Sequence, residues 1–201
     1  MMREVTLDTN CLIDLEQGTP NGVFIRGLMA DHASGKIRLR VPAIAASEIQ
    51  PGGGTLQSFN AFKARIHRAG LRGAILLEPP MYLDMCYIGF FIIGGQADVD
   101  LESRIHNVLH PAIEFDYVDY CAARGLTPDA APADRRWRNA KCDVLVVWSH
   151  IHYGGHVLVT ADEEFHKEHK RAALVGLGAG VIVRPKDARA VVACASGPTS
   201  A

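Results

Sequence analysis

Short apolar runs alternate with longer amphipathic runs along most of the chain. Apolar or alternating patterns bounded by glycine, proline or acids predict strands at 3–8, 36–42, 74–80, 156–162 and 180–185. Apolar residues at helical spacing predict helices at 11–18, 20–35, 43–50, 56–70, 139–153 and 163–178, with further helices within 98–124. Strands that alternate with helices in this way are typical of parallel β-α units, so the pattern predicts an α/β fold.

The length and composition fit one globular domain with an ordinary hydrophobic core. The chain has 201 residues, of which 48% are hydrophobic, and a single domain over residues 1–190 accounts for nearly all of them. Residues 191–201 end in the polar sequence SGPTSA and are expected to form a disordered tail. The net charge is −1, so no overall field attracts nucleic acid, and any such partner must be held locally.

The cysteines and the apolar stretches indicate a cytoplasmic protein. Five cysteines are scattered without a CxxC pair, as is typical of reduced thiols. The most apolar stretch, residues 81–95, contains Asp84 and is too short to span a bilayer. The chain opens without the basic and apolar pattern of a signal peptide. We therefore expect a cytoplasmic location and no membrane partner.

Acidic residues stand at comparable places in four of the predicted elements. Asp8 closes the first strand, Glu48 lies at the start of the helix after the second strand, Asp143 opens an apolar helix, and Asp162 closes the next strand. The carboxyl ends of parallel strands meet at one edge of a sheet, so these acids are expected to converge there. Two carboxylates about 5 Å apart repel each other by roughly 3 kcal/mol, and a divalent cation removes that repulsion. A set of oxygen ligands favours Mg²⁺ or Mn²⁺, bound as one ion or two.

The stretches that carry these acids resemble the motifs of a known family. They are LDTNCLID, PAIAASEI, NAKCDVLVV and LVTADEEF, and in this order they look like the motifs of the PIN-domain nucleases. The resemblance implies a three-layer α/β/α sandwich with a mainly parallel central sheet. It also implies a metal-dependent endoribonuclease that hydrolyses RNA phosphodiester bonds, with Asp8, Glu48, Asp143 and Asp162 as the catalytic, metal-binding acids.

The resemblance extends to the neighbours of these acids and to partners. Asn10 and Thr160 match the polar residues that orient the acids by hydrogen bonds. Residues 74–135 match nothing in the family and are longer than its small toxin members need, so we expect an inserted helical segment there. Many bacterial relatives are toxins held inactive by a small antitoxin, and many form dimers. RNA, an antitoxin-like inhibitor protein and a second copy of the chain are therefore the partner hypotheses.

Asp8 and Glu48 also have simpler interpretations, and the assignment of Asp162 is ambiguous. Asp8 can cap the helix that follows it, because Asp is a favoured N-cap residue. Glu48 taken alone is typical of a solvated helix residue. Glu163 and Glu164 directly follow Asp162, and either could replace it as a metal ligand.

A basic cluster lies just upstream of Asp143. It consists of Arg135, Arg136, Trp137, Arg138 and Lys141. Arginine and lysine bind phosphates, and tryptophan stacks on unpaired bases, which predicts a nucleic-acid contact. A solvated basic loop whose tryptophan packs against the core fits the same residues equally well.

Two other functions fit part of the pattern. A phosphatase of the haloacid dehalogenase kind also begins with an acid at a strand end, but it needs a second Asp where this chain has Asn10. A non-catalytic RNA- or protein-binding module of the same fold has no need of the four acids, and all four are present. A zinc site in SHIHYGGH is disfavoured, because His150 and His152 point to different faces of a helix.

Overall fold

The protein is built on a five-stranded sheet in which all neighbouring strands are parallel. The computed structural model describes residues 2–48, 56–128 and 133–194. The strand order is β3-β2-β1-β4-β5, which places β1 and β4 side by side although most of the chain separates them. The strands are β1 (Arg3–Leu7), β2 (Ile37–Pro42), β3 (Ile75–Leu77), β4 (Val157–Val159) and β5 (Val181–Val183). This sheet confirms the predicted α/β fold.

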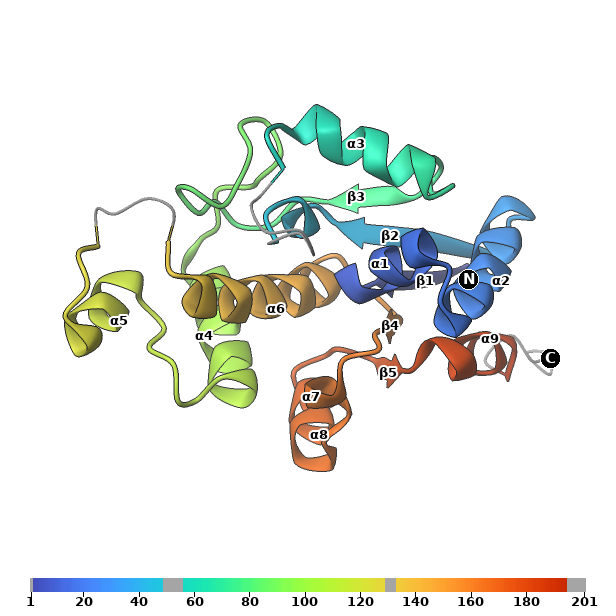
Figure 1. The fold of residues 1–201 in the computed structure, drawn as a ribbon. Helices are drawn as coiled ribbons and strands as arrows, with labels where there is room; N and C mark the ends of the chain where they lie inside the picture. The colour runs from blue at the N-terminus through green and yellow to red at the C-terminus, as the bar shows by residue number, and fades with distance from the viewer. Residues whose placement is uncertain (1, 49–55, 129–132, 195–201) are drawn as a thin grey trace.

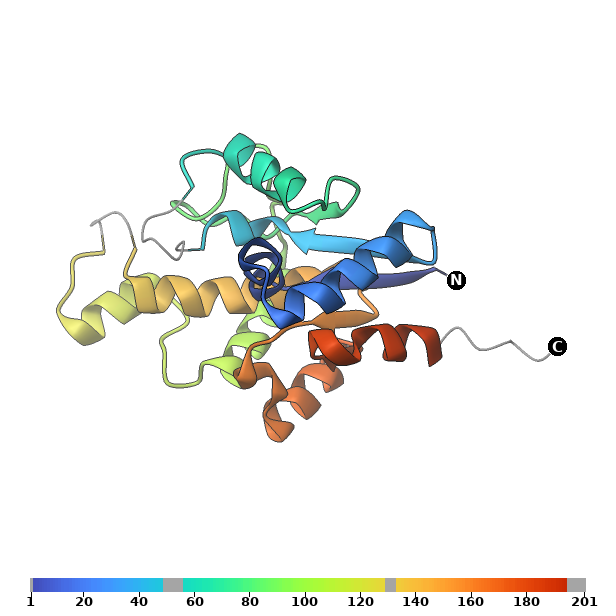
Figure 2. The same ribbon diagram turned by 45° about the vertical axis from the view of Figure 1, so that its right-hand side comes forward.

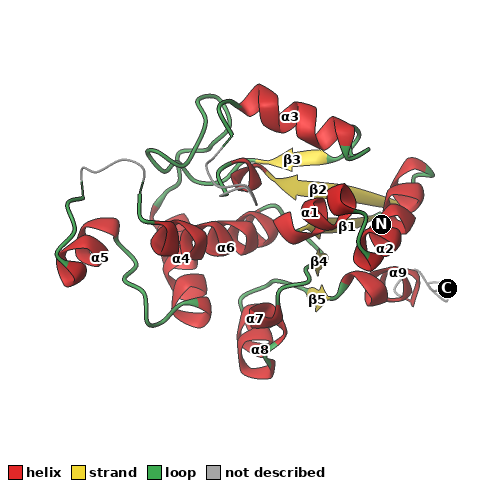
Figure 3. Cartoon of the chain, viewed as in Figure 1, coloured by secondary structure: helices red, strands yellow, loops and turns green. Residues whose placement is uncertain are grey.

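Helices cover both faces of the sheet, as Figure 1 and the secondary-structure colouring of Figure 3 show. One layer contains α1 (Thr9–Gln17), α2 (Pro20–Ala33), α3 (Phe59–Arg68) and α9 (Pro185–Cys194). The opposite layer contains α4 (Gln96–Leu109), α6 (Arg135–His152), α7 (Glu163–His166) and α8 (Glu168–Gly176). The remaining helix, α5 (Tyr117–Arg124), lies at one end of the molecule and apart from the sheet in both views (Figures 1 and 2).

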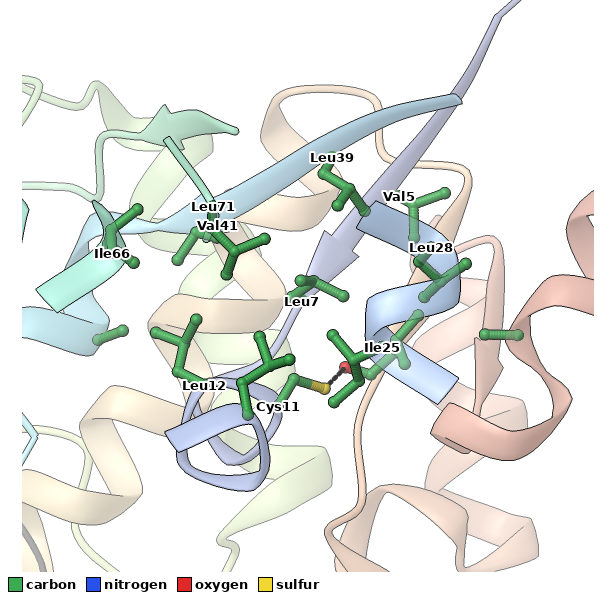
Figure 4. Packing of buried hydrophobic residues seen from close by; sticks show 14 of the residues in the cluster. Val5, Leu7, Cys11, Leu12, Ile25, Leu28, Leu39, Val41, Ile66 and Leu71 are labelled. Atoms are coloured by element: carbon green, nitrogen blue, oxygen red, sulfur yellow. Dashed lines mark hydrogen bonds between the residues drawn. The ribbon is translucent and has the colours of Figure 1, made fainter. Parts of the chain in front are cut away.

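The two-residue period of the strands explains why the sheet needs helices on both sides. In β4, Val157 and Val159 pack into the core below one face, while Leu158 packs into the core on the other. Val5 and Leu7 of β1 belong to the first of these cores, together with residues of α1 and α2 that Figure 4 shows at close range. β4 is buried on both faces and is apolar at every position. β2 instead alternates apolar residues with Arg38 and Arg40, which pair with Glu4 of β1.

A buried ion pair joins α4 to α6. The ammonium of Lys141 lies 2.7 Å from a carboxylate oxygen of Glu102, and both side chains are almost fully buried. The hydroxyl of Tyr82 donates to the same oxygen at 2.5 Å, and the Lys141 nitrogen lies 4.0 Å from the ring centre of Phe115. These contacts make Lys141 part of the core between the two helices.

The segment after β2 differs from its predicted helix. Residues 43–50 were expected to form a helix, but only a short 3₁₀ helix, η1 (Ala43–Ala46), forms, and Glu48 lies beyond it. The carbonyl of Ser47 accepts from Arg138 at 2.9 Å, and its hydroxyl donates to the Met85 carbonyl. The first contact occupies a backbone acceptor that a continued helix would use, and the second fixes the Ser47 side chain against the loop that contains Met85. Residues 49 and 50 and the predicted break at 51–55 lie outside the described residues.

The helix boundaries around the later acids also differ from the prediction. Helix α6 begins at Arg135 and not at 139, because the carboxylate of Asp134 accepts from the backbone N–H of Arg136 at 2.9 Å and caps it. Asp143 therefore lies in the interior of the helix. The predicted helix 163–178 is divided into α7 and α8 at Lys167, whose backbone is extended.

The ends of two predicted segments need correction as well. Residues 191–194 were assigned to the tail but belong to α9, while 195–201 lie outside the described residues. Within the expected insertion 74–135, β3 is an edge strand of the sheet and α4 packs on α6, so both are part of the main fold. None of the helices in the described chain is both long and apolar enough to cross a membrane.

Lys141→Met is expected to destabilise the fold by about 3–5 kcal/mol, because the Glu102 carboxylate would stay buried without its cation. The double variant Lys141→Met/Glu102→Gln should recover most of this loss, since it removes both charges and keeps an acceptor for Tyr82. Urea denaturation followed by circular dichroism measures both, with Arg135→Met at an exposed position of the same helix as the control. Equal stability of the single variant and the wild type would contradict the assignment of Lys141 to the core.

Candidate active site

Asp8 is a buried carboxylate at the carboxyl end of β1. Its backbone N–H donates to the Val159 carbonyl at 3.0 Å and so extends the β1–β4 ladder by one residue. One carboxylate oxygen accepts from the Thr9 N–H at 2.7 Å, and the other accepts from the Thr160 hydroxyl at 2.7 Å and from the Asn10 amide at 3.3 Å. Asp8 thus caps α1 with one oxygen and is oriented by two polar side chains through the other.

The hydroxyl of Thr160 connects two of the predicted acids. It donates to Asp8 and accepts from the backbone N–H of Asp162 at 3.0 Å. Asp162 in turn caps α7, because its carboxylate accepts from the Glu164 N–H at 2.8 Å. It therefore lies three residues beyond the end of β4 and starts the next helix.

Glu48 lies near the same region. It follows β2, which is the strand on the other side of β1 from β4. The hydroxyl of Thr9, which follows Asp8, donates to a carboxylate oxygen of Glu48. Burial raises the pKa of Glu48 well above its usual range, and the negative charges of Asp8 and Asp143 add to that effect. The charge of Arg65 acts in the opposite direction, although Arg65 is bonded to Glu16 at 2.7 and 2.8 Å.

Asp143 reaches the site from α6, and His110 holds it there. The ring Nε2 of His110 lies 3.1 Å from a carboxylate oxygen of Asp143. Burial, together with the nearby charge of Lys170, lowers the pKa of His110 to about 4. The imidazole is therefore neutral near pH 7, so the contact is a hydrogen bond and leaves the charge of Asp143 without compensation from His110.

The four predicted acids lie within range of one another's charge. Burial raises the pKa of Asp8, and Asp162 contributes to this increase. Burial also raises the pKa of Asp143 well above its usual range, with further contributions from the charges of Asp8 and Asp162. Over residues 2–48, 56–128 and 133–194, however, no group of three or more His, Cys, Asp or Glu side chains is arranged to hold one metal ion. The acids share an electrostatic environment without forming a closed ligand cage.

The two glutamates that follow Asp162 are engaged elsewhere. Glu163 binds the guanidinium of Arg184 at 2.6 and 2.7 Å. Glu164 binds Lys167, and Lys170 at 2.6 Å, and these ammonium groups lower the pKa of its carboxyl to about 2. Because cations already bind both carboxylates, Asp162 remains the better candidate ligand of the three.

Only part of the predicted basic cluster is on the surface. Trp137, Arg138 and Lys141 are buried, and the indole N–H of Trp137 donates to the Glu114 carbonyl at 3.1 Å. These three side chains are not accessible to a nucleic acid, and for Trp137 the packing interpretation holds. Arg135 and Arg136 are exposed and stay candidates for phosphate contacts.

Sequence reasoning missed three side chains of the site. Thr9 is the middle residue of the DTN motif, and its hydroxyl contact with Glu48 could have been suspected from that position. His110 and Lys170 gave no such signal, because 33 residues separate His110 from Asp143 and Lys170 belongs to a helix with many charges. The packing of α4 on α6, and of α8 on α4, brings them to the site.

The histidines of SHIHYGGH serve the fold and do not converge. His150 is buried, with its two ring nitrogens 2.8 Å from the Thr6 hydroxyl and 2.9 Å from the Ala179 carbonyl. His152 stacks on Trp148, with the ring centres 4.3 Å apart. These separate partners agree with the expectation that the two histidines point in different directions.

Comparison of the chain with models of known protein families and with curated proteins gives no match. At the level of the fold, the chain is an α/β protein whose parallel five-stranded sheet is flanked by helices. The carboxylates described above define a candidate active site on this fold.

In EDTA, Asp143→Asn is expected to be more stable than the wild type at pH 7, by about 1 kcal/mol or roughly 2–4 °C in Tm. The raised pKa of Asp143 means that the folded chain holds a proton that the unfolded chain releases above about pH 4. Wild-type stability therefore falls as pH rises above that value, and the advantage of the variant should vanish near pH 4. Asparagine still offers His110 a hydrogen-bonding partner.

Thermal unfolding at pH 4, 5.5 and 7 measures this difference, with the exposed Asp119→Asn on α5 as the matched control. A variant that is less stable than the wild type at pH 7 would show that repulsion at the site is not a cost to folding.

Proposed function

We propose that the protein is a metal-dependent endoribonuclease that hydrolyses RNA phosphodiester bonds at this site. The observation that carries the proposal is the grouping of Asp8, Glu48 and Asp143. These carboxylates come from three separate parts of the chain. Burial raises the pKa of each one, and the charge of at least one neighbouring acid raises it further. Perturbed acids of this kind are concentrated at functional sites, where burial and neighbouring charges shift pKa values to suit the chemistry.

The donor set suits a hard divalent cation. The candidate ligands are all carboxylate oxygens, which Mg²⁺ and Mn²⁺ prefer over nitrogen and sulfur. Magnesium commonly binds one or two protein carboxylates and keeps several waters, so it does not require three side chains to be in place. When bound, such an ion lowers the pKa of a coordinated water and polarises a phosphodiester.

The remaining side chains fit the roles of orienting and binding groups. Thr160 and Asn10 would fix the rotamer of Asp8, while Thr9 would do so for Glu48 and His110 for Asp143. Asp8 and Asp143 would hold the ion directly, with Glu48 and Asp162 as further ligands. Arg135 and Arg136, exposed on the first turn of α6, would bind RNA phosphates.

Asp8→Asn and Asp143→Asn are expected to abolish cleavage of end-labelled single-stranded RNA in Mg²⁺ or Mn²⁺, and EDTA should abolish it in the wild type. Thr160→Val, which removes only a hydrogen bond to a ligand, should lower the rate less, by roughly 10–100-fold. Asp119→Asn, an exposed acid outside the site, should leave the rate unchanged.

Binding of Mn²⁺, measured by calorimetry on the same proteins, separates the outcomes. Metal binding by the wild type without cleavage of any RNA would favour a non-catalytic binding module of the same fold. Cleavage that survives Asp8→Asn and Asp143→Asn would contradict the site. Hydrolysis of phosphate monoesters without cleavage of RNA would favour the phosphatase alternative.

A further inference from the structure

A second feature of the molecule lies at the end that carries α5 and the start of α6 (Figure 1). A pocket of about 400 Å³ opens there between residues 81–84, residues 115–118 and the first turn of α6. Its walls are largely aromatic and include Tyr82, Phe115, Tyr117 and Trp137. The rings of Tyr117 and Trp137 lie 4.9 Å apart between centres, so the wall is firmly packed.

Large apolar side chains stand exposed around this pocket. Leu83 is 87% exposed and Val118 is 59% exposed, and both line the pocket together with Met81. Met81 and Tyr82 also line a smaller neighbouring pocket, which includes Ile93, itself 84% exposed. The two pockets thus adjoin each other. Exposed apolar patches of this kind mark interaction sites on protein surfaces.

The charge on this surface is negative. Asp84 and Asp116 line the larger pocket, and among the described residues no lysine, arginine or histidine lines either pocket. One oxygen of Asp84 binds Arg138 at 3.3 Å, and one oxygen of Asp116 accepts from the Val118 N–H at 2.8 Å. In each of these two carboxylates, the contact uses one oxygen and does not involve the other.

These properties discriminate between the possible occupants. RNA is disfavoured inside the pocket, because its phosphates would approach Asp84 and Asp116, whereas Arg135 and Arg136 are not among the residues that line it. In a symmetric dimer the same patch faces its copy, which would bring these acids opposite one another without cations. A small ligand would fill the pocket but leave Leu83 and Ile93 in water. A peptide can cover the pocket and its rim together.

We propose that this surface docks a short segment of another protein that combines large apolar side chains with lysine or arginine. The apolar side chains would fill the pocket and cover Leu83 and Ile93. The cation would pair with Asp84 or Asp116 and lie against the face of Tyr117 or Tyr82. This binding site is separate from the candidate active site, so it does not depend on nuclease activity.

Selection of random 16-residue peptides on phage, against immobilised full-length protein, tests the proposal. Enriched peptides are expected to contain at least two large apolar residues and one or more Lys or Arg. Their synthetic forms should bind at least about tenfold more weakly to Val118→Asp and to Leu83→Asp, because a new carboxylate would have to be buried against apolar groups. Fluorescence anisotropy in EDTA measures the affinities.

Two matched controls make the result specific. Val23→Asp changes a valine of α2 that is 63% exposed, and this variant should bind the peptides as the wild type does. Asp84→Asn/Asp116→Asn keeps the shape of the pocket and should weaken binding by cationic peptides and reduce its dependence on salt. No enrichment, enrichment of acidic peptides, or equal binding to Val118→Asp and Val23→Asp would each overturn the proposal. Circular dichroism of every variant confirms that it is folded.

Discussion

The hydrogen bond between the Thr160 hydroxyl and the Asp8 carboxylate is the contact on which the site depends. It joins the ends of β1 and β4, which are neighbours in the centre of the sheet. The same hydroxyl accepts from the Asp162 N–H, and the same carboxylate caps α1. A buried carboxylate needs such donors, because its desolvation is otherwise costly. Two strand ends and two helix starts are therefore positioned by one small group of polar atoms.

The nearby cations are paired with other acids and compensate the central carboxylates only in part, which agrees with the raised pKa values of Asp8, Glu48 and Asp143. Arg65 is bonded to Glu16, Lys170 to Glu164 and Arg184 to Glu163, all of them acids outside the central group. The neutral His110 contributes a hydrogen bond to Asp143 but no positive charge. The resulting repulsion opposes folding, and the apolar cores on both faces of the sheet offset it.

Much of the fold could be predicted from the sequence, because strands buried on both faces and helices with one apolar face leave different periodicities. The exact limits of α6 could not be predicted, because its start depends on the cap formed by Asp134. The helix predicted after β2 does not form as expected, and there Ser47 is bonded to Arg138 and Met85 instead. The burial of basic side chains could not be predicted either. Nothing in the sequence distinguishes Lys141, which is buried against Glu102, from the exposed Arg135, because the difference lies in the distant α4.

Helix α6 is the element that relates the two surfaces of the molecule. Trp137 forms a wall of the aromatic pocket, and Asp143 belongs to the acidic site six residues later, or roughly 9 Å along a helix. Between them, Arg138 contacts both Asp84 at the pocket and the carbonyl of Ser47, the residue before Glu48. Arg138 therefore contacts both the rim of the pocket and the backbone just before Glu48, through two different nitrogens of its guanidinium. The pocket and the acids are distinct sites, but they share one rigid helix and one buried guanidinium.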